Sequence, residues 1–258
     1  MRIISCAQMS PRLASCRADV MDNVRRMEPL VSEAASVGTQ LLVFPELAFT
    51  GYSLFGQEEA MAVAEPFDGP TFKAMGRVAG QLQSYVAWGY VELDGESLFN
   101  SCSLIGPDGS LLSSYRKVNL YSCDYTWAKP GLEPAPVAQT ELGAMSVIVC
   151  RDIRNKVPDN IPRTAKERPL MKSKVDIVAG VVNWGAGGGY PPVTFMDFVA
   201  DVQCTLAVAD RHGVEKRLDG FSSNFGTGKT AIITPDWKVH MGGMVHGGDC
   251  LVTHGLEG

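Results

Sequence analysis

Short runs of almost wholly apolar residues recur along this chain and alternate with segments of helical periodicity. Residues 2–8 and 40–44 are two such runs, and each is typical of a strand buried on both faces. Between them, apolar residues recur at steps of three and four over 20–34, which predicts a helix with Asp19 as its N-cap. Pro29 should kink or split this helix, because proline lacks a backbone donor. Strand, helix and strand in succession predict an α/β layer architecture.

The rest of the chain continues this alternation. A second helix is predicted over 69–83, and Asp-Gly turn dipeptides at 94–95 and 108–109 then separate three runs of an antiparallel meander. Residues 121–143 contain three prolines and little periodicity, which predicts a loop, whereas 193–203 are predicted to be helical. The segments predicted as further strands are 85–91, 97–105, 111–116, 144–149, 175–182, 206–209 and 229–234, the last clear one.

The composition bounds the class of protein. The chain has 258 residues, of which 45% are hydrophobic, and this is enough to bury a large core in one domain over 1–258. Neither a linker-like change in composition nor an internal repeat divides it. The formal net charge of −5 argues against nucleic acid as a partner, because nucleic-acid-binding proteins need a strongly basic face.

The apolar runs and the cysteines also bear on location. No run approaches the ~18 consecutive apolar residues of a membrane-spanning helix. The N-terminal run is too short for a signal-peptide core, and Gln8 and Arg12 interrupt its continuation. Seven cysteines are scattered without a repeating spacing, as is usual for reduced, buried thiols. We therefore expect a cytoplasmic protein that does not engage a membrane.

Three residues of complementary chemistry come directly after predicted strands. Glu46, Lys117 and Cys150 each stand one or two residues past an apolar run. Strand ends at a sheet edge are where α/β folds place reactive groups. A thiol there is a nucleophile, a desolvated carboxylate is a general base, and an ammonium group stabilises an oxyanion. Taken singly, each residue is more simply a core cysteine, an exposed glutamate or a solvated lysine, but together they are candidates for one catalytic set.

Histidine chemistry fits the sequence less well. The four histidines lie in the last fifth of the chain and none has a local signature, so the base for Cys150 need not be histidine. His246, Cys250 and His254 have a four-residue spacing that would suit a metal site on a helix. Glycines at 247–248 disfavour that helix, and we expect a surface tail there instead.

A phosphate-binding loop is a further alternative. Residues 226–230 read Gly-Thr-Gly-Lys-Thr, like the end of such a loop. The full motif needs a glycine where Ser223 stands, and a helix must follow the lysine to present its N-terminus to phosphate. A strand is predicted there, so the nucleotide-binding interpretation is disfavoured.

The segments around the three candidate residues resemble the nitrilase, or carbon–nitrogen hydrolase, superfamily. The matching motifs are Phe44-Pro45-Glu46 with Gly51-Tyr52, then Tyr115-Arg116-Lys117, then Cys150-Arg151-Asp152 at the end of an apolar strand. Their order and spacing fit the family. Supporting likeness is found at Asn100, Asn183-Trp184 and Arg211, so the resemblance spans roughly residues 3–235.

This resemblance implies a four-layer α-β-β-α sandwich with no metal and no organic cofactor. It implies attack of the Cys150 thiolate on the carbon of a small amide, while Glu46 relays protons and Lys117 stabilises the tetrahedral intermediate. An acyl-enzyme would form, ammonia or an amine would leave, and water activated by Glu46 would release the acid. A homodimer or larger homo-oligomer is also implied. The substrate-binding residues that it implies are Tyr52, Asp124, Arg151, Asn183 and Trp184.

The sequence departs from the family's pattern in four places. Asn119 stands where a histidine is frequent, and the Pro-Glu that follows the nucleophile in the family has no clear match in 155–159. Asp124 stands where many family amidases have a second glutamate ahead of Pro-Gly, and it is one methylene shorter. Arg151 stands where the family usually has an aromatic residue. Beside the nucleophile, Arg151 is a candidate either to lower the Cys150 pKa or to bind a substrate carboxylate. The simpler interpretation is an arginine turned away into an ion pair with an acidic neighbour.

The leading hypothesis is an amidase acting on a small carboxamide, which the short chain favours because nitrilases of the family tend to be longer. A nitrile or N-carbamoyl hydrolase of the same superfamily is the near alternative. From another class, the chain would be a non-catalytic family member that binds a ligand. The complete set of Glu46, Lys117 and Cys150 argues against that, because a binding role would not require all three.

Overall fold

The computed structural model describes residues 1–154, 174–187, 189–242 and 248–256. The helices are α1 (Arg17–Arg26), α2 (Glu28–Ser36), α3 (Gln57–Val63), α4 (Pro70–Leu82) and α5 (Val193–Val202), with the short 3-10 helices η1 (Ser122–Thr126) and η2 (Cys150–Ile153). The strands of the first half are β1 (Arg2–Gln8), β2 (Leu41–Val43), β3 (Tyr85–Asp94), β4 (Ser97–Ile105) and β5 (Leu111–Arg116). Those of the second half are β6 (Val137–Thr140), β7 (Gly143–Val149), β8 (Ile177–Val181), β9 (Thr205–Ala209), β10 (Gly213–Lys216), β11 (Ser222–Gly226), β12 (Ala231–Ile233), β13 (Val239–Met241) and β14 (Cys250–Leu256).

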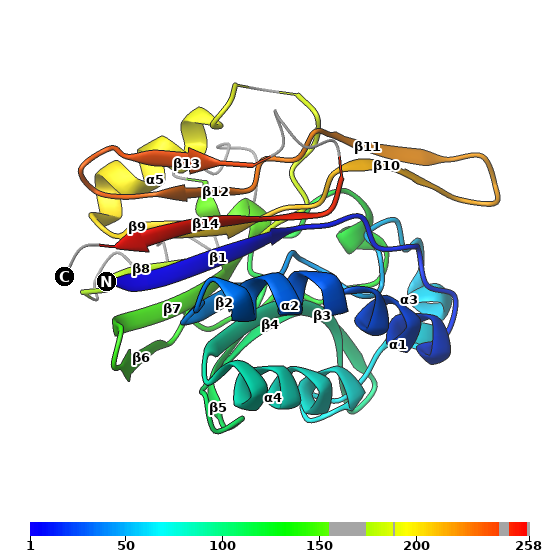
Figure 1. The fold of residues 1–258 in the computed structure, drawn as a ribbon. Coiled ribbons are helices and arrows are strands. Elements are labelled where there is room, and N and C mark those ends of the chain that lie inside the picture. The colour runs from blue at the N-terminus through cyan, green and yellow to red at the C-terminus, as the bar shows by residue number, and fades with distance from the viewer. Residues whose placement is uncertain (155–173, 188, 243–247, 257–258) are drawn as a thin grey trace.

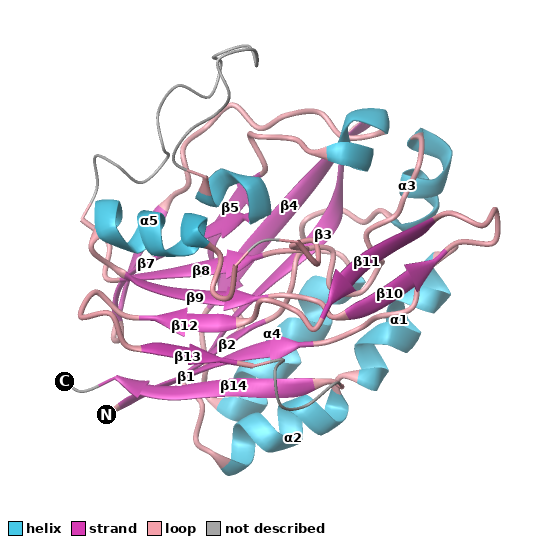
Figure 2. Ribbon diagram, turned by 90° about the horizontal axis from the view of Figure 1, so that it is seen from above, coloured by secondary structure: helices cyan, strands magenta, loops and turns pink. Residues whose placement is uncertain are grey.

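Within these residues, two six-stranded sheets pack face to face. The first sheet has the order β14-β1-β2-β3-β4-β5, and the second has the order β13-β12-β9-β8-β7-β6. Helices α1, α2 and α4 cover the outer face of the first sheet (Figure 1). Helix α5 covers the outer face of the second sheet (Figure 2). The predicted α-β-β-α sandwich is confirmed.

The central strands are largely apolar, and both of their faces are buried. On β3, Tyr85 and Ala87 belong to the core that joins the two sheets, whereas Val86 and Trp88 belong to the core beneath the helices. Successive side chains of a strand point to opposite faces, so one strand contributes to both cores. This is why the sequence shows continuous apolar runs here rather than an alternation of apolar and polar residues.

The predicted first helix is divided, as its proline requires. Helix α1 ends at Arg26 and α2 begins at Glu28, with Pro29 in the first turn of α2, where its missing N–H is harmless. The prediction that Asp19 is the N-cap is wrong. Helix α1 begins earlier, after Cys16, so Asp19 falls in its first turn and accepts the backbone N–H of Ser15 at 2.8 Å.

The C-terminal part of the chain differs most from expectation. Strands β13 and β14 follow the segment predicted as the last strand, and β14 pairs antiparallel with β1 from Gln8↔Cys250 to Arg2↔Leu256. The expected surface tail is therefore an edge strand over Cys250–Leu256, and His246 lies outside the described residues. The predicted loop 121–143 contains η1 and β6. A short, partly exposed strand such as β6 has no regular pattern of apolar residues from which it could be predicted.

The arrangement of the second sheet places several loops at one edge. Strands β7, β8 and β9 run parallel, so their carboxyl ends share that edge. Cys150, Asn183 and Asp210 follow these three strands in turn. The β10–β11 hairpin projects beyond the sandwich on the same side (Figure 1). No helix in the described ranges is long and apolar enough to cross a bilayer.

Candidate active site

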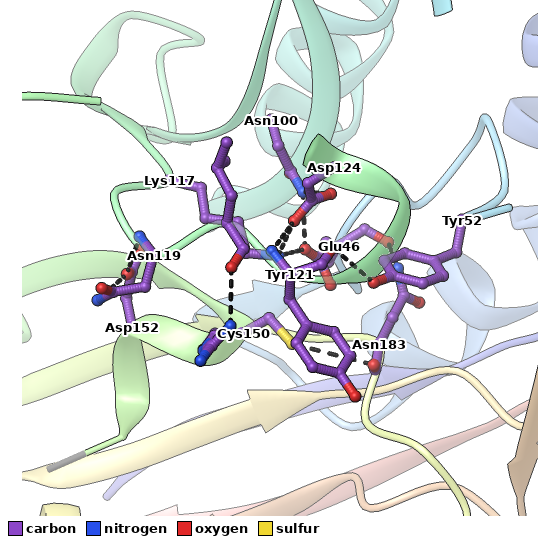
Figure 3. A network of polar contacts seen from close by, with 12 residues as sticks. Glu46, Tyr52, Asn100, Lys117, Asn119, Tyr121, Asp124, Cys150, Asp152 and Asn183 are labelled. Atoms are coloured by element: carbon purple, nitrogen blue, oxygen red, sulfur yellow. Dashed lines mark hydrogen bonds and ion pairs between the residues drawn. The ribbon is translucent and has the colours of Figure 1, made fainter. Parts of the chain in front are cut away.

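Glu46, Lys117 and Cys150 come from three separate strand ends and lie together in the structure (Figure 3). Glu46 is in the turn after β2, and Lys117 directly follows β5 of the same sheet. Cys150 directly follows β7 of the second sheet. The three side chains that the sequence singled out therefore meet where the edges of the two sheets converge.

The ammonium group of Lys117 is held between two carboxylates. Its Nζ atom lies 2.6 Å from Oε1 of Glu46 and 2.6 Å from Oδ2 of Asp124. All three side chains are inaccessible to solvent. Coulomb attraction is strong in such an interior, and it compensates the cost of removing these charges from water. Asp124, predicted to bind substrate, thus contacts the lysine directly.

Asn100 donates hydrogen bonds to both of the carboxylates that hold Lys117. Its side-chain amide donates to Oε1 of Glu46 at 2.8 Å and to Oδ1 of Asp124 at 3.1 Å. Its backbone carbonyl accepts the N–H of Lys117 at 2.8 Å. The sequence marked Asn100 only as a matching position, because an asparagine inside a strand carries no chemical signal until its neighbours are known.

The charges of this cluster shift one another's protonation. Burial raises the pKa of Glu46, although the Lys117 ammonium opposes that rise. Burial alone would lower the pKa of Lys117, but the charges of Asp124 and Glu46 outweigh it and hold that pKa well above its usual range. Burial raises the pKa of the Cys150 thiol, with Glu46 adding to the rise and Lys117 opposing it. The arrangement therefore combines a basic carboxylate, a permanent cation and a protonated thiol.

Three residues on the segments that carry this cluster have a strained backbone. Leu47, Ser122 and Cys150 have φ values of 47°, 50° and 43°, in the left-handed region that side chains disfavour. Each such residue costs of order 1–3 kcal/mol and persists only where its surroundings impose it. At Cys150 this conformation turns the backbone sharply at the end of β7.

Asn183 lies between Glu46 and Cys150. Its side-chain NH₂ group donates to the backbone carbonyl of Glu46 at 2.9 Å. The backbone carbonyl of Asn183 accepts a hydrogen bond from the Cys150 thiol at 3.9 Å. Within the described part of the chain, Oε2 of Glu46, Oδ1 of Asn183 and Oδ1 of Asn100 are buried without a hydrogen-bond partner. Each of these acceptors is available to an N–H or O–H group of a ligand or of water.

Tyr52 reaches the same region from the loop after Glu46. Its hydroxyl donates to the carbonyl of Tyr121 at 3.4 Å, and burial raises its pKa. The backbone N–H of Tyr52 donates to Glu215, which pairs with the buried Arg211 at 2.6 Å. An ion pair between Arg211, in the loop after β9, and Glu215 of β10 therefore anchors Tyr52.

Arg151 and Trp184 contact residues outside the charged cluster. A terminal nitrogen of Arg151 donates to the carbonyl of Leu120 at 3.0 Å, and its guanidinium lies 5.4 Å from the Tyr121 ring centre. Among the described residues its contacts are thus with a carbonyl and a ring, not with the acidic neighbour of the simpler interpretation. The half-buried Trp184 packs edge-on against Phe195 at 4.9 Å.

Comparison with known proteins places the fold and the cluster in one family. The carbon–nitrogen hydrolase family model matches residues 3–160. A nitrilase of Pyrococcus abyssi is 31% identical over 237 residues, covering 92% of this chain and 82% of the relative. A probable nitrilase of Schizosaccharomyces pombe is 28% identical over 246 residues, with the same two coverages. An omega-amidase of Danio rerio is 36% identical over 104 residues, 40% of this chain and 36% of that relative.

A solved structure agrees with this placement at the level of the fold. A mutant of the amidase from Nesterenkonia sp. AN1 superposes with a TM-score of 0.77 at 20% identity, covering 100% of this chain and 94% of that one. The family model spans more than half of the chain and includes the segments of Glu46, Lys117 and Cys150. This chain therefore belongs to the carbon–nitrogen hydrolase family of the nitrilase superfamily and is a hydrolase of carbon–nitrogen bonds.

Proposed function

We propose that this hydrolase cleaves a small carboxamide through a thioester on Cys150, with Glu46, Lys117 and Cys150 as catalytic residues. The observation that carries the proposal is the Lys117 ammonium, held 2.6 Å from Glu46 beside the thiol whose pKa both charges influence. A base paired with a cation, together with a nucleophile whose ionisation both charges influence, supplies the parts that acyl transfer requires.

The proposed reaction begins with proton transfer from the Cys150 thiol to Glu46, whose raised pKa makes it a better base near neutrality. The thiolate adds to the amide carbon, and the Lys117 ammonium stabilises the resulting oxyanion. Glu46 then gives its proton to the departing nitrogen, the carbon–nitrogen bond breaks, and a thioester remains. Water that loses a proton to Glu46 attacks the thioester carbon, and the acid leaves as the proton returns to sulfur.

Asp124 supports this cycle through Lys117. With two carboxylates beside it, the ammonium stays charged while Glu46 gains and loses a proton. Asn100 keeps both carboxylates oriented during the cycle. These contacts support a role for Asp124 in tuning the lysine, in addition to any contact with substrate.

We propose Tyr52, Arg151, Asn183 and Trp184 as the residues that bind the substrate around this cluster. The proposal for Arg151 is the most specific, because a guanidinium next to the nucleophile in sequence can form paired hydrogen bonds with a substrate carboxylate. Kinetics of Arg151→Lys and Arg151→Tyr on acidic and neutral amides test this role. An unchanged ranking of substrates would contradict it.

A nitrile or N-carbamoyl substrate is the second candidate. The relatives that align over 92% of this chain are named nitrilases, whereas the omega-amidase aligns over 40%. The same nucleophile, base and cation serve attack on a nitrile carbon. Substrate assays separate the candidates.

The decisive experiment is ammonia release from a panel of carboxamides, nitriles and N-carbamoyl compounds, combined with intact-mass detection of an acyl adduct. We expect turnover of at least one carboxamide and an adduct on Cys150 that Cys150→Ala lacks. Full activity in Cys150→Ala would refute the mechanism. No turnover anywhere, with ligands still bound, would favour a non-catalytic binding protein.

The proposed assembly is a homodimer or larger homo-oligomer, as the family resemblance implies, and light scattering of the purified protein tests it. The proposed location is the cytoplasm. All seven cysteines are free, which accords with a reducing compartment.

A further inference from the structure

The carboxylate of Asp152 accepts four hydrogen bonds from the segment that carries Lys117. Its Oδ2 atom accepts the hydroxyl of Tyr115 at 2.8 Å and the backbone N–H of Val118 at 3.1 Å. Its Oδ1 atom accepts the backbone N–H of Asn119 at 2.8 Å and the side-chain amide of that residue at 2.7 Å. The partners precede and follow Lys117 in sequence, so this carboxylate holds the lysine's segment on both sides. Figure 3 shows the pair of Asp152 and Asn119 beside Lys117.

Asp152 stands on the opposite sheet from that segment. It lies in η2, two residues after Cys150, and η2 directly follows β7. The backbone N–H and carbonyl of Lys117 bond instead to Asn100 and Gly131, each at 2.8 Å, on its own side of the sandwich. The bonds to Asp152 therefore connect the segment of the ammonium to the segment of the thiol.

The chemistry of the four donors requires an ionised carboxylate. Two carboxylate oxygens provide about four lone-pair sites, and each oxygen here accepts two of the donors. An asparagine at this position would have one acceptor oxygen, and its NH₂ group would face other donors. The side chain is 2% exposed, so water cannot readily replace the lost acceptor.

We propose that Asp152 is a positioning residue that sets the separation between the Cys150 sulfur and the Lys117 ammonium. The catalytic consequence of this positioning rests on the proposed function. Asp152 touches neither the sulfur nor the ammonium and acts through the backbone on either side of the lysine. A displacement of about 1 Å at such a site is enough to lower turnover by about 100-fold.

The test is a double-mutant cycle read at the Cys150 sulfur. Wild type, Asp152→Asn, Lys117→Gln and the double variant react with iodoacetamide at pH 8. Peptide mass spectrometry follows Cys150 separately from the exposed Cys16. We expect Asp152→Asn to slow alkylation about tenfold, because a more distant ammonium stabilises the thiolate less. The double variant should be no slower than Lys117→Gln alone, because the carboxylate acts through the lysine.

The matched control is Asp176→Asn. Asp176 is likewise a carboxylate that accepts a backbone N–H, that of Ala144 at 2.8 Å, but Ala144 lies at the end of β7 opposite to Cys150. The Asp176→Asn variant should be alkylated at Cys150 at the wild-type rate. If Asp152→Asn does not fold, Tyr115→Phe and Asn119→Ala each remove one donor and keep the carboxylate. Each substitution should slow alkylation of Cys150 a few-fold when made alone. Combined with Lys117→Gln, it should not slow alkylation further.

Two results would overturn the inference. One is additive slowing in the double variant, because Asp152 would then act without Lys117. The other is alkylation of folded Asp152→Asn at the wild-type rate. In assays of turnover we expect a kcat about 100-fold lower with little change in KM. A wild type that hydrolyses nothing would contradict the proposed function alone, since the alkylation cycle decides the positioning role independently.

Discussion

A Cβ atom at position 89 would lie 2.7 Å from the Cα atom of Glu46, so Gly89 and Glu46 are in direct backbone contact. The N–H of Gly89 donates to the carbonyl of Pro45 at 3.1 Å, and the N–H of Ala48 donates to the carbonyl of Gly89 at 3.0 Å. Only glycine allows the turn after β2 to approach β3 this closely. The position of the candidate base thus depends on a missing side chain in a neighbouring strand.

Gly89→Ala should therefore inactivate the enzyme. The added methyl group must push the Glu46 turn away from β3, and a shift of about 1 Å would lower kcat by about 100-fold. Steady-state kinetics on the best substrate of the panel measure this effect. The control is Gly80→Ala in α4, where the nearest atom to the new Cβ is 3.9 Å away. It should keep full activity and gain about 0.5–1 kcal/mol of helix stability. Activity of Gly89→Ala within about twofold of wild type would contradict this account.

Removing the Lys117 charge should cost stability as well as activity. Lys117→Met leaves Glu46 and Asp124 buried without their cation, and we expect unfolding free energy to fall by about 3–5 kcal/mol. Urea unfolding measures this loss. Adding Asp124→Asn should recover part of the stability, because only one buried carboxylate then lacks a partner, but should recover no activity. A double variant no more stable than Lys117→Met would show that the two carboxylates do not repel each other significantly.

Glu65 should make stability depend on pH. Burial raises its pKa to about 7, although the N–H of Thr71, which it accepts, opposes the rise. Because the folded pKa exceeds the unfolded value of about 4.3, its contribution is complete below pH ~4 and is lost as the pH rises to about 7. The loss amounts to at most about 4 kcal/mol.

Unfolding of wild type and Glu65→Gln by urea at pH 4.5 and pH 8 tests this dependence. The variant cannot ionise, so its stability relative to wild type should increase by about 2–3 kcal/mol between the two pH values. Other buried carboxylates titrate equally in both proteins and cancel in the comparison. A difference that does not change with pH would rule out Glu65 as the source.

The pair of Arg211 and Glu215 should control the Tyr52 loop. Glu215 accepts the N–H of Ser53 at 2.6 Å as well as that of Tyr52, and its partner Arg211 is 1% exposed. Arg211→Met leaves Glu215 buried and unpaired, so we expect a loss of about 3–5 kcal/mol. Thermal and urea unfolding report that loss. If Tyr52 binds substrate, the variant's KM should rise more than its kcat falls.

A second substitution separates charge from packing in this pair. Arg211→Met with Glu215→Gln removes both charges and should be more stable than Arg211→Met alone. Equal stability of the two variants would mean that the arginine acts by packing against Phe225, whose ring lies 4.8 Å from its guanidinium.

Local pattern accounts for most of the fold. Strands such as β2, β7 and β9 are short apolar runs, and their burial on two faces follows from that pattern alone. The Pro29 break was also predicted, because proline acts on its own helix. Strand β14 was missed, since Cys250–Leu256 contains glycine and polar residues and becomes a strand only by pairing with β1. The assignment of 1–258 to one domain stays a prediction.

For the candidate site, the sequence by itself determined which side chains follow the buried strands and which family their motifs match. Glu46, Lys117 and Cys150 were identified in this way, because strand ends and short motifs are local properties. Only the tertiary structure decided that Asp124 shares the Lys117 ammonium with Glu46, and that Asp152 ties the lysine's segment to the thiol's. These contacts join residues from different sheets and loops. Their geometry depends on how the two sheets pack, which no local pattern records.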